Sequence, residues 1–556
     1  MNFKSFAVGI LSSFYLLENA NAFSVQNSSP FRAALKTTTR ATPPTTSTST
    51  SLFAIEKGTI QILMSDTGGG HRASANALRD AFDELYPGQI EVDIVDIFTD
   101  YGPFFPINAF VPIYKIMAEY PILWEITFKS GATPFGLWFN ELVLEVRHEI
   151  LQFCYMIGCA FQACFKFLVE IRFISFHIYI FLTYPLTIVH SIQCYNFQLF
   201  CFDSFKECMA RQSSSTDTRA DMVVSVHPLT QDIPLKILNC LDTNGKSRTS
   251  GRTTPFATVV TDLGGAHPTW FNPGADTCFV PSDALNKAAR DRNVKPEQII
   301  QYGLPIRRGF WGESGKQAAT GGGNFIEDLF AGFSGGDASK KKPKSDPSKS
   351  RQQIKLGLKQ DVPTVLIVGG GDGIGGIIPQ AKAMGEKLSA KSTEDGKEYQ
   401  MIVVCGNNEN AQKVLSSKEW GEGVNVEVKG FVNNMDEFMR SSDVIVTKAG
   451  PGTIAEASIC GLPCMLSSYL PGQEEGNVPF VEDAGFGAYS GNPTKIADTV
   501  STWLSSPEML SSMKEAALEA ARPSATVDIA KDLAAMLFEH KNKQKQAAGA
   551  EELIAQ

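Results

Sequence analysis

The stretch DVIVTKAGPGTIAEASICGLPCMLSSYLPGQEEG, residues 443–476, decides the fold because it combines a strand, a turn, a helix and a second strand. Residues 444–446 form a short β-branched run, which is typical of a buried strand. Gly450 and Gly452 flank a proline and supply a turn in which the backbone approaches a ligand closely. The helix that follows should end before Pro463, where an apolar run resumes as strand. The stretch therefore predicts a β-α-β unit of an α/β fold.

Polar side chains gather on this helix and after its second strand. Thr453 and Glu456 stand three residues apart and predict a capping box at the helix start. Glu456 also has a second interpretation, because two acceptor oxygens suit the two hydroxyls of a ribose diol. Gln473, Glu474 and Asn477 follow the second strand, at the edge where open α/β sheets bind ligands. Their amide and carboxylate groups suit the hydroxyls of a sugar.

The motifs TKAGPGTIAEA, residues 447–457, and PGQEEGNVPFV, residues 471–481, resemble the donor half of monogalactosyldiacylglycerol synthases. That family belongs to the glycosyltransferase group that includes the peptidoglycan N-acetylglucosaminyltransferase. The resemblance covers roughly residues 58–140 and 205–535. It implies an α/β fold of the GT-B class, in which two Rossmann-like domains face each other across a cleft.

The resemblance also implies a reaction, the transfer of galactose from UDP-galactose to 1,2-diacylglycerol with inversion at the anomeric carbon. It implies no cofactor and no metal, and it implies a membrane surface with anionic lipids as a partner. Two alternatives stay open. One is a glucosyl or N-acetylglucosaminyl transferase acting on a lipid, and the other is a subunit that binds a UDP-sugar without chemistry.

Length and composition limit the function further. The chain has 556 residues, enough for two domains with additional segments. A formal net charge of -9 argues against nucleic acid as the main partner. The 11 cysteines show no paired metal-binding spacing and indicate reduced, packed thiols.

The first residues have the composition of targeting segments. Residues 1–22 place a lysine before an apolar run and small residues, which predicts a secretory signal peptide. Residues 23–56 are rich in Ser and Thr, carry basic residues and resemble a plastid transit peptide. Together they resemble the two-part presequence of algae whose plastids lie inside extra membranes. The expected location is the plastid envelope, with peripheral membrane attachment.

The mature protein is expected to begin near residue 57, where a strand leads through three glycines into a helix. Gly69 and Gly70 bring bare backbone amides to the helix N-terminus, where anionic oxygens bind favourably. His71 follows in the first turn. A structural role is the ordinary interpretation of a single histidine, but this one follows glycines at the carboxyl end of a strand. His71 is therefore the candidate general base.

Two later strands should end near the same cleft. Residues 222–226 form an apolar run that ends at His227, and residues 256–261 end at Asp262. His267 follows in the same motif, which resembles one of the family. His267 is the second candidate for the base, and Asp262 is a candidate for orienting either imidazole.

One segment does not fit the family pattern. Residues 147–202 are apolar almost throughout, although four charged residues interrupt the first half. A hydrophobic membrane hairpin and an unspliced intron read in frame are the two explanations, and we prefer the intron. Residues 101–138, before this insert, are rich in aromatic residues and proline, a composition that suits a bilayer interface.

These features divide the chain. Residues 57–312 form an N-terminal domain on the acceptor and membrane side, and residues 313–352 form a flexible linker rich in Gly, Ser and Lys. Residues 353–535 form the UDP-sugar domain, and residues 536–556 form a polar helical tail. Arg307, just before the linker, is a candidate donor to the diphosphate, although a surface arginine is an equal alternative.

The second domain adds further candidates for the donor site. Gly370 and Gly371 follow its first strand, in a run that fits G-x-G-x-x-G and serves a nucleotide diphosphate as well as a dinucleotide. Asn407 ends a later strand. Phe431 and Val432 occupy the position where the related enzymes hold uracil, whereas a core role for Phe431 is the alternative.

Overall fold

The computed structural model describes residues 57–103, 107–112, 114, 201–213, 218–311, 347–369 and 376–555. Several predictions lie outside these residues. They are the targeting segments 1–56, the aromatic region beyond residue 114, most of the insert 147–202, most of the linker 313–352, and the candidates Gly370 and Gly371.

The first half of the described chain contains a six-stranded parallel sheet in the order β2-β1-β3-β4-β5-β6. Its strands are β1 (Gly58–Met64), β2 (Ile90–Asp96), β3 (Met222–Ser225), β4 (Phe256–Val259), β5 (Thr277–Val280) and β6 (Ile299–Gln301). All seven residues of β1 are buried, as expected for a central parallel strand covered on both faces. The strand order reverses between β1 and β3, which makes the carboxyl ends of these two strands the topological switch point.

Helices and short 3₁₀ turns connect these strands. They are α2 (Gly69–Leu85), α3 (Ile97–Tyr101), η1 (Ile107–Ala109), α10 (Asp232–Asp242), η2 (Pro268–Trp270), α11 (Asp283–Asp291), η3 (Pro296–Gln298) and η4 (Arg308–Phe310). A further helical segment covers residues 201–210, and Cys201 and Phe205 in it are fully buried beside Phe98. Cys201 thus belongs to the core, although the sequence analysis placed it within the insert.

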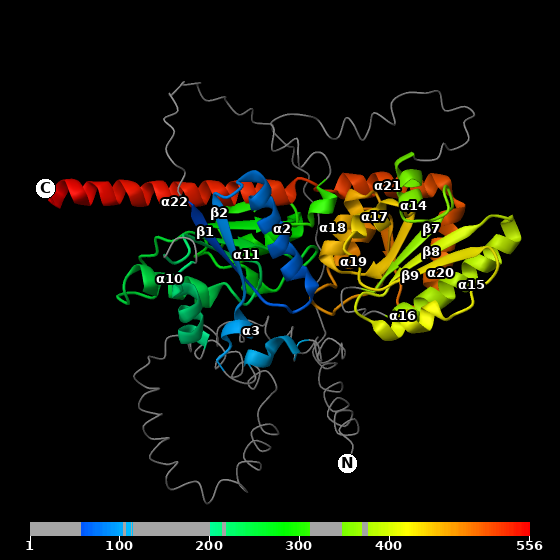
Figure 1. Cartoon of the computed structure of the whole chain (residues 1–556), viewed down its shortest axis with the longest axis horizontal. Helices are drawn as coiled ribbons and strands as arrows, with labels where there is room; N and C mark the ends of the chain where they lie inside the picture. Colours follow the sequence, from blue (N-terminus) through cyan, green and yellow to red (C-terminus); the bar gives the residue numbers. More distant parts are fainter. Residues whose placement is uncertain are drawn as a thin grey trace, which may run out of the picture. The chain divides into compact units, whose positions relative to one another are not determined.

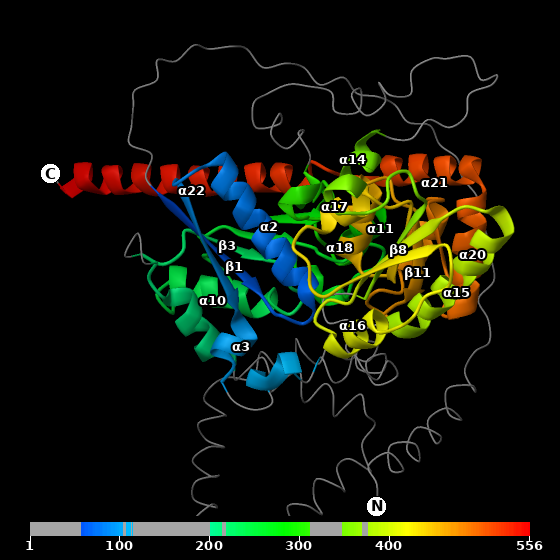
Figure 2. The ribbon, with the colours of Figure 1, turned by 45° about the vertical axis from the view of Figure 1, so that its right-hand side comes forward.

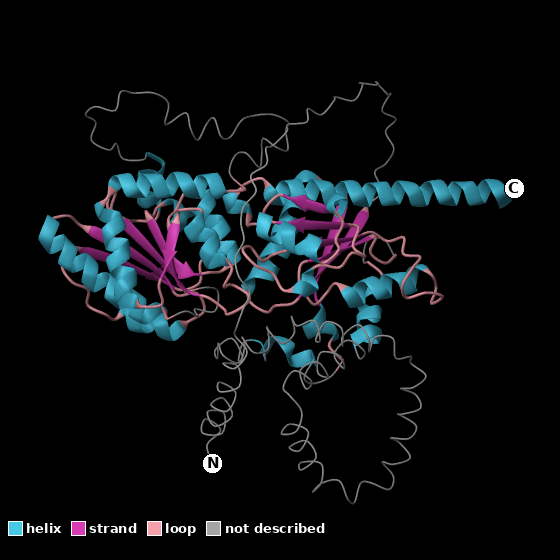
Figure 3. Ribbon diagram, turned by 180° about the vertical axis from the view of Figure 1, so that it is seen from behind, coloured by secondary structure: helices cyan, strands magenta, loops and turns pink. Residues whose placement is uncertain are grey.

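The second half contains another six-stranded parallel sheet, in the order β12-β11-β10-β7-β8-β9. Its strands are β7 (Thr364–Val368), β8 (Tyr399–Val404), β9 (Val424–Lys429), β10 (Val444–Lys448), β11 (Cys464–Ser468) and β12 (Gly487–Tyr489). Numbered within this half, the order is 3-2-1-4-5-6, that of a Rossmann sheet, with its switch point between β7 and β10. Figure 3 shows the strands of the two sheets as separate groups with helices beside them.

The helices of this half are α14 (Pro347–Lys355), α15 (Ile377–Asp395), α16 (Glu409–Ser416), α17 (Met435–Arg440), α18 (Pro451–Ile459), α19 (Asn477–Asp483), α20 (Pro493–Ser505) and α21 (Pro507–Ala520). The two parallel sheets with their helices confirm the predicted α/β fold with two Rossmann-like domains. The β-α-β unit predicted from residues 443–476 is confirmed as β10, α18 and β11.

The last helix, α22 (Ala525–Ala555), returns to the first sheet and runs past β1 and α2 (Figures 1 and 2). Leu537 is fully buried, and a Cβ atom on Gly58 would lie 2.7 Å from its Cδ2 atom. Thr526 Oγ1 accepts from Ile306 N at 2.8 Å and donates to Ile306 O at 3.1 Å. The structure therefore differs from the predicted boundary at residue 535, because the helix continues through it and its apolar face packs on the first half.

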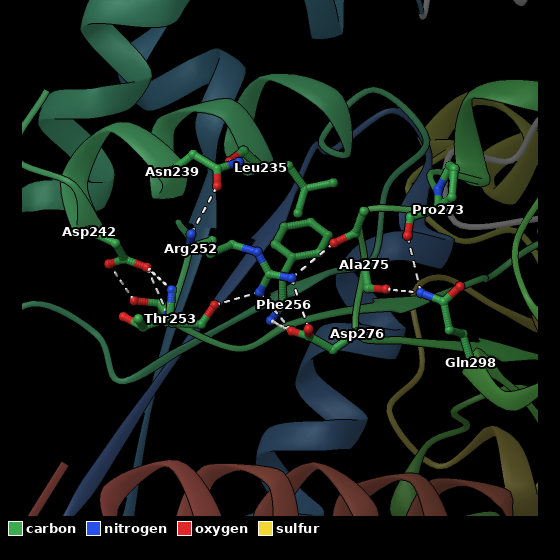
Figure 4. A network of polar contacts seen from close by, with 12 residues as sticks. Leu235, Asn239, Asp242, Arg252, Thr253, Phe256, Pro273, Ala275, Asp276 and Gln298 are labelled. Carbon is green, nitrogen blue, oxygen red and sulfur yellow. Dashed lines mark hydrogen bonds and ion pairs between the residues drawn. The ribbon is translucent and has the colours of Figure 1, made fainter. Parts of the chain in front are cut away.

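A network of polar contacts fixes the loop that leads into β4 (Figure 4). The Arg252 guanidinium donates to both carboxylate oxygens of Asp276, at 2.6 and 2.8 Å. Asp276 also accepts from Phe256 N at 2.8 Å, and Asn239 accepts from Arg252 N at 3.0 Å. This network holds the amino end of β4, the strand that precedes Asp262 and His267.

Candidate active site

The turn between β1 and α2 presents open backbone amides at the switch point of the first sheet. Gly68 caps the helix with φ of 89°, a conformation that favours glycine. A Cβ atom built on Gly69 or Gly70 meets nothing within 4 Å, so the space beside both residues is open. Arg72 pairs with Asp66 in the same turn and holds the loop to its helix. The predicted glycine turn therefore leaves room for a ligand.

His71 is buried in the first turn of α2 and is held through one ring nitrogen. Its Nδ1 atom lies 2.9 Å from the carbonyl oxygen of Val226 and 2.9 Å from Oγ1 of Thr261. Because a carbonyl oxygen only accepts, Nδ1 carries the proton and the lone pair lies on Nε2. Burial lowers the pKa of His71 to about 4, so the ring is neutral at pH 7. A neutral imidazole with its lone pair on Nε2 is the form that accepts a proton.

A second imidazole lies beside it. The ring centroids of His71 and His227 are 4.7 Å apart in an edge-on arrangement. His227 Nδ1 accepts from Leu229 N at 3.2 Å, so its Nε2 donates to Thr67 Oγ1 at 3.0 Å. Burial, and then the neighbouring His71, lower the pKa of His227 well below its ordinary value. Both ring nitrogens of His227 are thus hydrogen-bonded to protein groups, so the residue has a supporting role in the site.

Asp262 is buried after β4, and its hydrogen-bond partner is an indole. Its Oδ2 atom accepts from Trp270 Nε1 at 2.6 Å. The pKa of Asp262 is raised to about 7, chiefly by burial, while the hydrogen bond from Trp270 lowers it and the nearby Glu474 raises it. The sequence predicts that Asp262 orients an imidazole. In the structure that orientation comes instead from Val226 and Thr261, which bind His71.

His267 has a different use. It caps the short η2 helix, where its Nδ1 atom accepts from Thr269 N at 3.3 Å and lies 2.7 Å from Thr269 Oγ1. Because a backbone amide only donates, the Nδ1 lone pair of His267 is occupied, and a neutral ring carries its proton on Nε2. This geometry favours His71 over His267 as the base.

The donor loop begins α18 without a side-chain cap. The predicted capping box of Thr453 and Glu456 is wrong, because the helix starts at Pro451 with Gly450 as its N-cap. Proline at the first helical position has a suitable φ and needs no N–H partner. Thr453 is therefore already inside the first turn. A Cβ atom on Gly452 meets nothing within 4 Å, so the loop keeps an open face.

Arg307 and Glu456 bind each other. Arg307 Nε donates to Glu456 Oε1 at 2.6 Å, and Nη2 donates to the other carboxylate oxygen. Burial raises the pKa of Glu456, and the opposing effect of Arg307 is smaller. This two-pronged pair joins the end of the first half to α18. Glu456 is thus neither a backbone cap nor a solvated carboxylate. The pair must break before Glu456 binds a ribose or Arg307 binds a diphosphate.

A pocket opens at the carboxyl ends of β7 and β8, beside the switch point of the second sheet. It is lined by Arg307, Val368, Val404, Gly406, Phe431, Val432, Met435, Met439 and Thr453. Four predicted residues meet there, namely Arg307, Phe431, Val432 and Thr453. Phe431 is 63% exposed, so the alternative that it is a core residue is wrong. Asn407 is exposed and adjoins Gly406 of the lining.

The predicted sugar-binding group after β11 is largely occupied by protein contacts. Glu474 is buried, forms an ion pair with Lys448 and accepts from Leu470 N at 3.0 Å. Gln473 Oε1 accepts from the Tyr114 hydroxyl at 3.3 Å. Asn477 is buried, and its amide group bonds to the backbone on both sides. Among these residues, the negative charge of Glu474 raises the pKa of Asp262 in the other half.

Sequence reasoning missed several residues of this site. The side chains that bind His71, His227 and Asp262 are those of Thr261, Thr67 and Trp270, respectively. Lys448 forms an ion pair with Glu474. Trp270 and Lys448 stand inside the motifs HPTWF and TKAGPGT, so their position beside candidate residues was the available signal. In the described part of the chain, no group of three or more His, Cys, Asp or Glu side chains is placed to hold a metal ion.

The fold and the site together define a class of protein. Two doubly wound parallel sheets carry a neutral imidazole at one switch point, and an arginine and an open aromatic ring at the other. Two Rossmann-like domains of this kind define a protein of the GT-B fold class.

Comparison with known proteins gives the family. Residues 161–306 match the model of monogalactosyldiacylglycerol (MGDG) synthase, and residues 364–532 match the glycosyltransferase family 28 C-terminal domain. Monogalactosyldiacylglycerol synthase 3, chloroplastic, of Arabidopsis thaliana is 32% identical over 88% of this chain and 82% of its own length. The chloroplastic synthase of Spinacia oleracea is 33% identical over 85% of this chain and 72% of its own. The chain belongs to the monogalactosyldiacylglycerol synthase family.

Solved structures are more distant. MurG of Acinetobacter baumannii is 13% identical and gives a TM-score of 0.42 over 85% of this chain and 98% of its own. The UDP-GlcNAc 2-epimerase of Neisseria meningitidis, solved with UDP-GlcNAc, is 12% identical and gives a TM-score of 0.44 over 87% and 100%. Across the residues that the structure describes, no helix has the length and apolar character needed to span a membrane.

Proposed function

We propose that this chain transfers galactose from UDP-galactose to the free hydroxyl of 1,2-diacylglycerol, with inversion, and so makes monogalactosyldiacylglycerol. The observation that carries the proposal is family membership, since the chain matches relatives named monogalactosyldiacylglycerol synthase over 85–88% of its length. The neutral imidazole of His71, placed at a switch point with Nε2 as acceptor, supplies the group that the reaction needs.

The proposed chemistry follows from His71. The hydroxyl of diacylglycerol has a pKa far above 7, so its proton must leave as its oxygen attacks the anomeric carbon. Nε2 of His71 takes that proton, and Nδ1–H, bonded to Val226, holds the ring in position. Attack from the face opposite to the departing UDP inverts the anomeric carbon and gives a β-linkage.

The donor would bind over the second sheet. We assign uracil to Phe431 and Val432, because Phe431 offers an exposed aromatic face beside the pocket. The diphosphate would meet the amides at Gly450 and Gly452 and the N-terminus of α18, whose dipole favours anions. Arg307 would exchange Glu456 for a phosphate, which frees the Glu456 carboxylate for the ribose hydroxyls. Charge on the leaving UDP would then be stabilised where it develops.

The proposed site of action is a plastid membrane. The relatives that the chain matches are named chloroplastic, and residues 1–56 have the composition of a two-part targeting sequence. A diacylglycerol acceptor resides in a bilayer, so we infer that the protein binds the surface of the plastid envelope, and that anionic lipids assist this binding.

The test is an assay of the purified chain with diacylglycerol in mixed micelles and either UDP-galactose or UDP-glucose. The expected product is a monogalactosyl lipid with a β-linkage, identified by mass spectrometry and NMR, and turnover should persist in EDTA. Preference for UDP-glucose would transfer the assignment to a glucosyltransferase. Absence of turnover with both donors, despite UDP binding, would indicate a non-catalytic subunit.

A further inference from the structure

Two glycines from the two halves of the chain meet backbone to backbone. Gly264 lies in the loop after β4, and Gly476 caps α19. A Cβ atom on Gly264 would lie 1.9 Å from the carbonyl oxygen of Gly476. A Cβ atom on Gly476 would lie 2.7 Å from the carbonyl carbon of Gly264. Because both neighbours are backbone and neither can move aside alone, only glycine fits on either side of this contact.

The adjacent Asn477 bonds both halves at once. Its Oδ1 atom accepts from Gly264 N at 2.7 Å, and its Nδ2 atom donates to the carbonyl oxygen of Ala449 at 2.8 Å. An amide N–H only donates and a carbonyl only accepts, so the two contacts fix the orientation of the side chain. Asn477 is 1% exposed. The side chain therefore holds protein backbone and is removed from solvent.

The two backbone groups that Asn477 joins belong to opposite sides of the site. Ala449 directly precedes Gly450, the N-cap of α18 and the start of the proposed diphosphate loop. Gly264 follows Asp262 by two residues, in the loop that also carries His267. One amide group thus sets the distance between the donor loop and the loop of the first half.

We propose that Asn477, with the Gly264–Gly476 contact, is a positioning element that holds the two halves of the site at the separation that the reaction needs. The inference rests on the proposed function, and it differs from the sequence-based expectation that Asn477 binds the sugar. Contact with the sugar is then left to groups such as Gln473, which is partly exposed.

The expected effect is on the reacting geometry, more than on donor affinity. Replacing Asn477 by alanine leaves a buried N–H and a buried C=O unpaired and removes the link between the loops. A misplacement of about 1 Å between reacting groups lowers turnover on the order of 10²-fold. Phe431, Gly450 and Gly452 remain in place, but Asn477 also holds Ala449 beside the diphosphate loop, so the Kd of UDP should rise by a smaller factor than kcat falls.

The experiment compares Asn477→Ala and Gly264→Ala with Gly265→Ala in the full chain. Gly265 is the matched control, because a Cβ atom there meets only Gly476 Cα at 3.8 Å, an ordinary contact. We expect kcat to fall roughly 10²-fold in the first two variants and less than twofold in the control. The Kd of UDP, measured by calorimetry, should rise by a smaller factor than kcat falls in the first two variants and stay near that of the wild type in the control. Small-angle scattering should show a larger radius of gyration for Gly264→Ala.

Two results would overturn the inference. A raised KM for UDP-galactose in Asn477→Ala, with unchanged kcat and a normal Gly264→Ala, would make Asn477 a sugar ligand. Identical scattering and kinetics of Gly264→Ala and wild type would show that the contact does not form. If the wild type itself transfers no galactose, the proposed function fails, and scattering alone decides whether the junction holds the halves together.

Discussion

His71 and His267 are both held through Nδ1, but Nδ1 donates in His71 and accepts in His267, and this difference assigns their roles. The carbonyl oxygen of Val226 accepts a hydrogen bond from Nδ1–H of His71, so Nε2 remains as a base, whereas Thr269 N donates to the Nδ1 lone pair of His267. We expect His71→Ala to lower kcat by about 10²- to 10⁴-fold, the usual contribution of a general base. The Kd of UDP should stay near that of the wild type, as measured by calorimetry.

The matched control is His267→Asn, because asparagine is a good N-cap and retains an acceptor for Thr269 N. Activity of this variant should lie within a few-fold of the wild type. Because burial lowers the pKa of His71 to about 4, the loss of kcat/KM caused by its protonation should appear near pH 4. Near-normal turnover in His71→Ala, together with its loss in His267→Asn, would assign the base to His267.

The raised pKa of Asp262 predicts how the stability of the folded protein depends on pH. Its pKa is about 7 in the folded protein against 3.8 ordinarily, so between these values the folded state holds a proton that the unfolded state has released. Stability from this group is therefore lost as the pH rises toward 7, by roughly 4 kcal/mol in total. Asp262→Asn keeps the acceptor for Trp270 and removes the charge. The variant should unfold at a higher temperature than the wild type at pH 8 and at nearly the same temperature at pH 4.

His71 acts in the opposite direction between pH 4 and 6.5, because its lowered pKa makes stability rise with pH there. That contribution is present in both proteins and cancels in the comparison. Equal unfolding temperatures of Asp262→Asn and wild type at pH 8 would mean that Asp262 is not buried as a neutral acid. Turnover of the same variant at pH 8 then reports whether the reaction needs the carboxylate.

At the scale of secondary-structure elements, the pocket beside β7 and β8 predicts how UDP binds. Phe431 is 63% exposed, and a stacked base contributes about 1–3 kcal/mol. Phe431→Ala should therefore weaken UDP binding by roughly 5- to 150-fold, as measured by calorimetry, whereas Phe431→Trp should preserve it. Met509, an exposed apolar residue outside the pocket lining, provides the control Met509→Ala. An unchanged Kd in Phe431→Ala would exclude stacking on this ring.

Local sequence predicted the elements better than it predicted their contacts. The strand and helix of residues 443–476 were found from apolar runs and glycines, because these signals act over a few residues. The capping box failed at the same place, because a Gly-Pro start overrides a threonine two residues later. The helix beyond residue 535 was predicted, but its packing on Gly58 was not, because that contact depends on how the chain returns to the first sheet.

Ion pairs between residues far apart in the sequence could not be predicted from the sequence either. Arg307 and Glu456 were each assigned to the donor, but 149 positions separate them, and their mutual pairing depends on the fold. The same holds for Asn477, whose partners Gly264 and Ala449 lie in different halves. Sequence identifies residues with suitable chemistry, whereas the assembled sheets decide which of them already have partners.

At the scale of the whole molecule, residues 147–202 bear on how the chain is produced. We infer that most of this segment is a translated intron, because pyrimidine-rich DNA encodes the Phe, Leu, Ile, Ser and Cys that dominate it. The cellular transcript should then lack the corresponding bases. The family-model match, which begins at residue 161 and so includes residues 161–202, is the observation that opposes this inference. Recovery of peptides from this segment in the native protein would refute the inference.

The structure refines where the segment can be cut. Cys201 lies in the helical stretch of residues 201–210 and is fully buried in the same core cluster as Phe205 and Phe98, so it is part of the first domain. Deletion of residues 147–200 should raise the soluble yield and preserve kcat, because every described contact of the core is retained. Deletion of residues 147–202 also removes Cys201 and should unfold at a lower temperature, since lost burial of a core side chain typically costs about 1–3 kcal/mol. Equal stability of the two deletions would show that the helix does not need Cys201, and loss of turnover in the shorter deletion would show that the segment belongs to the enzyme.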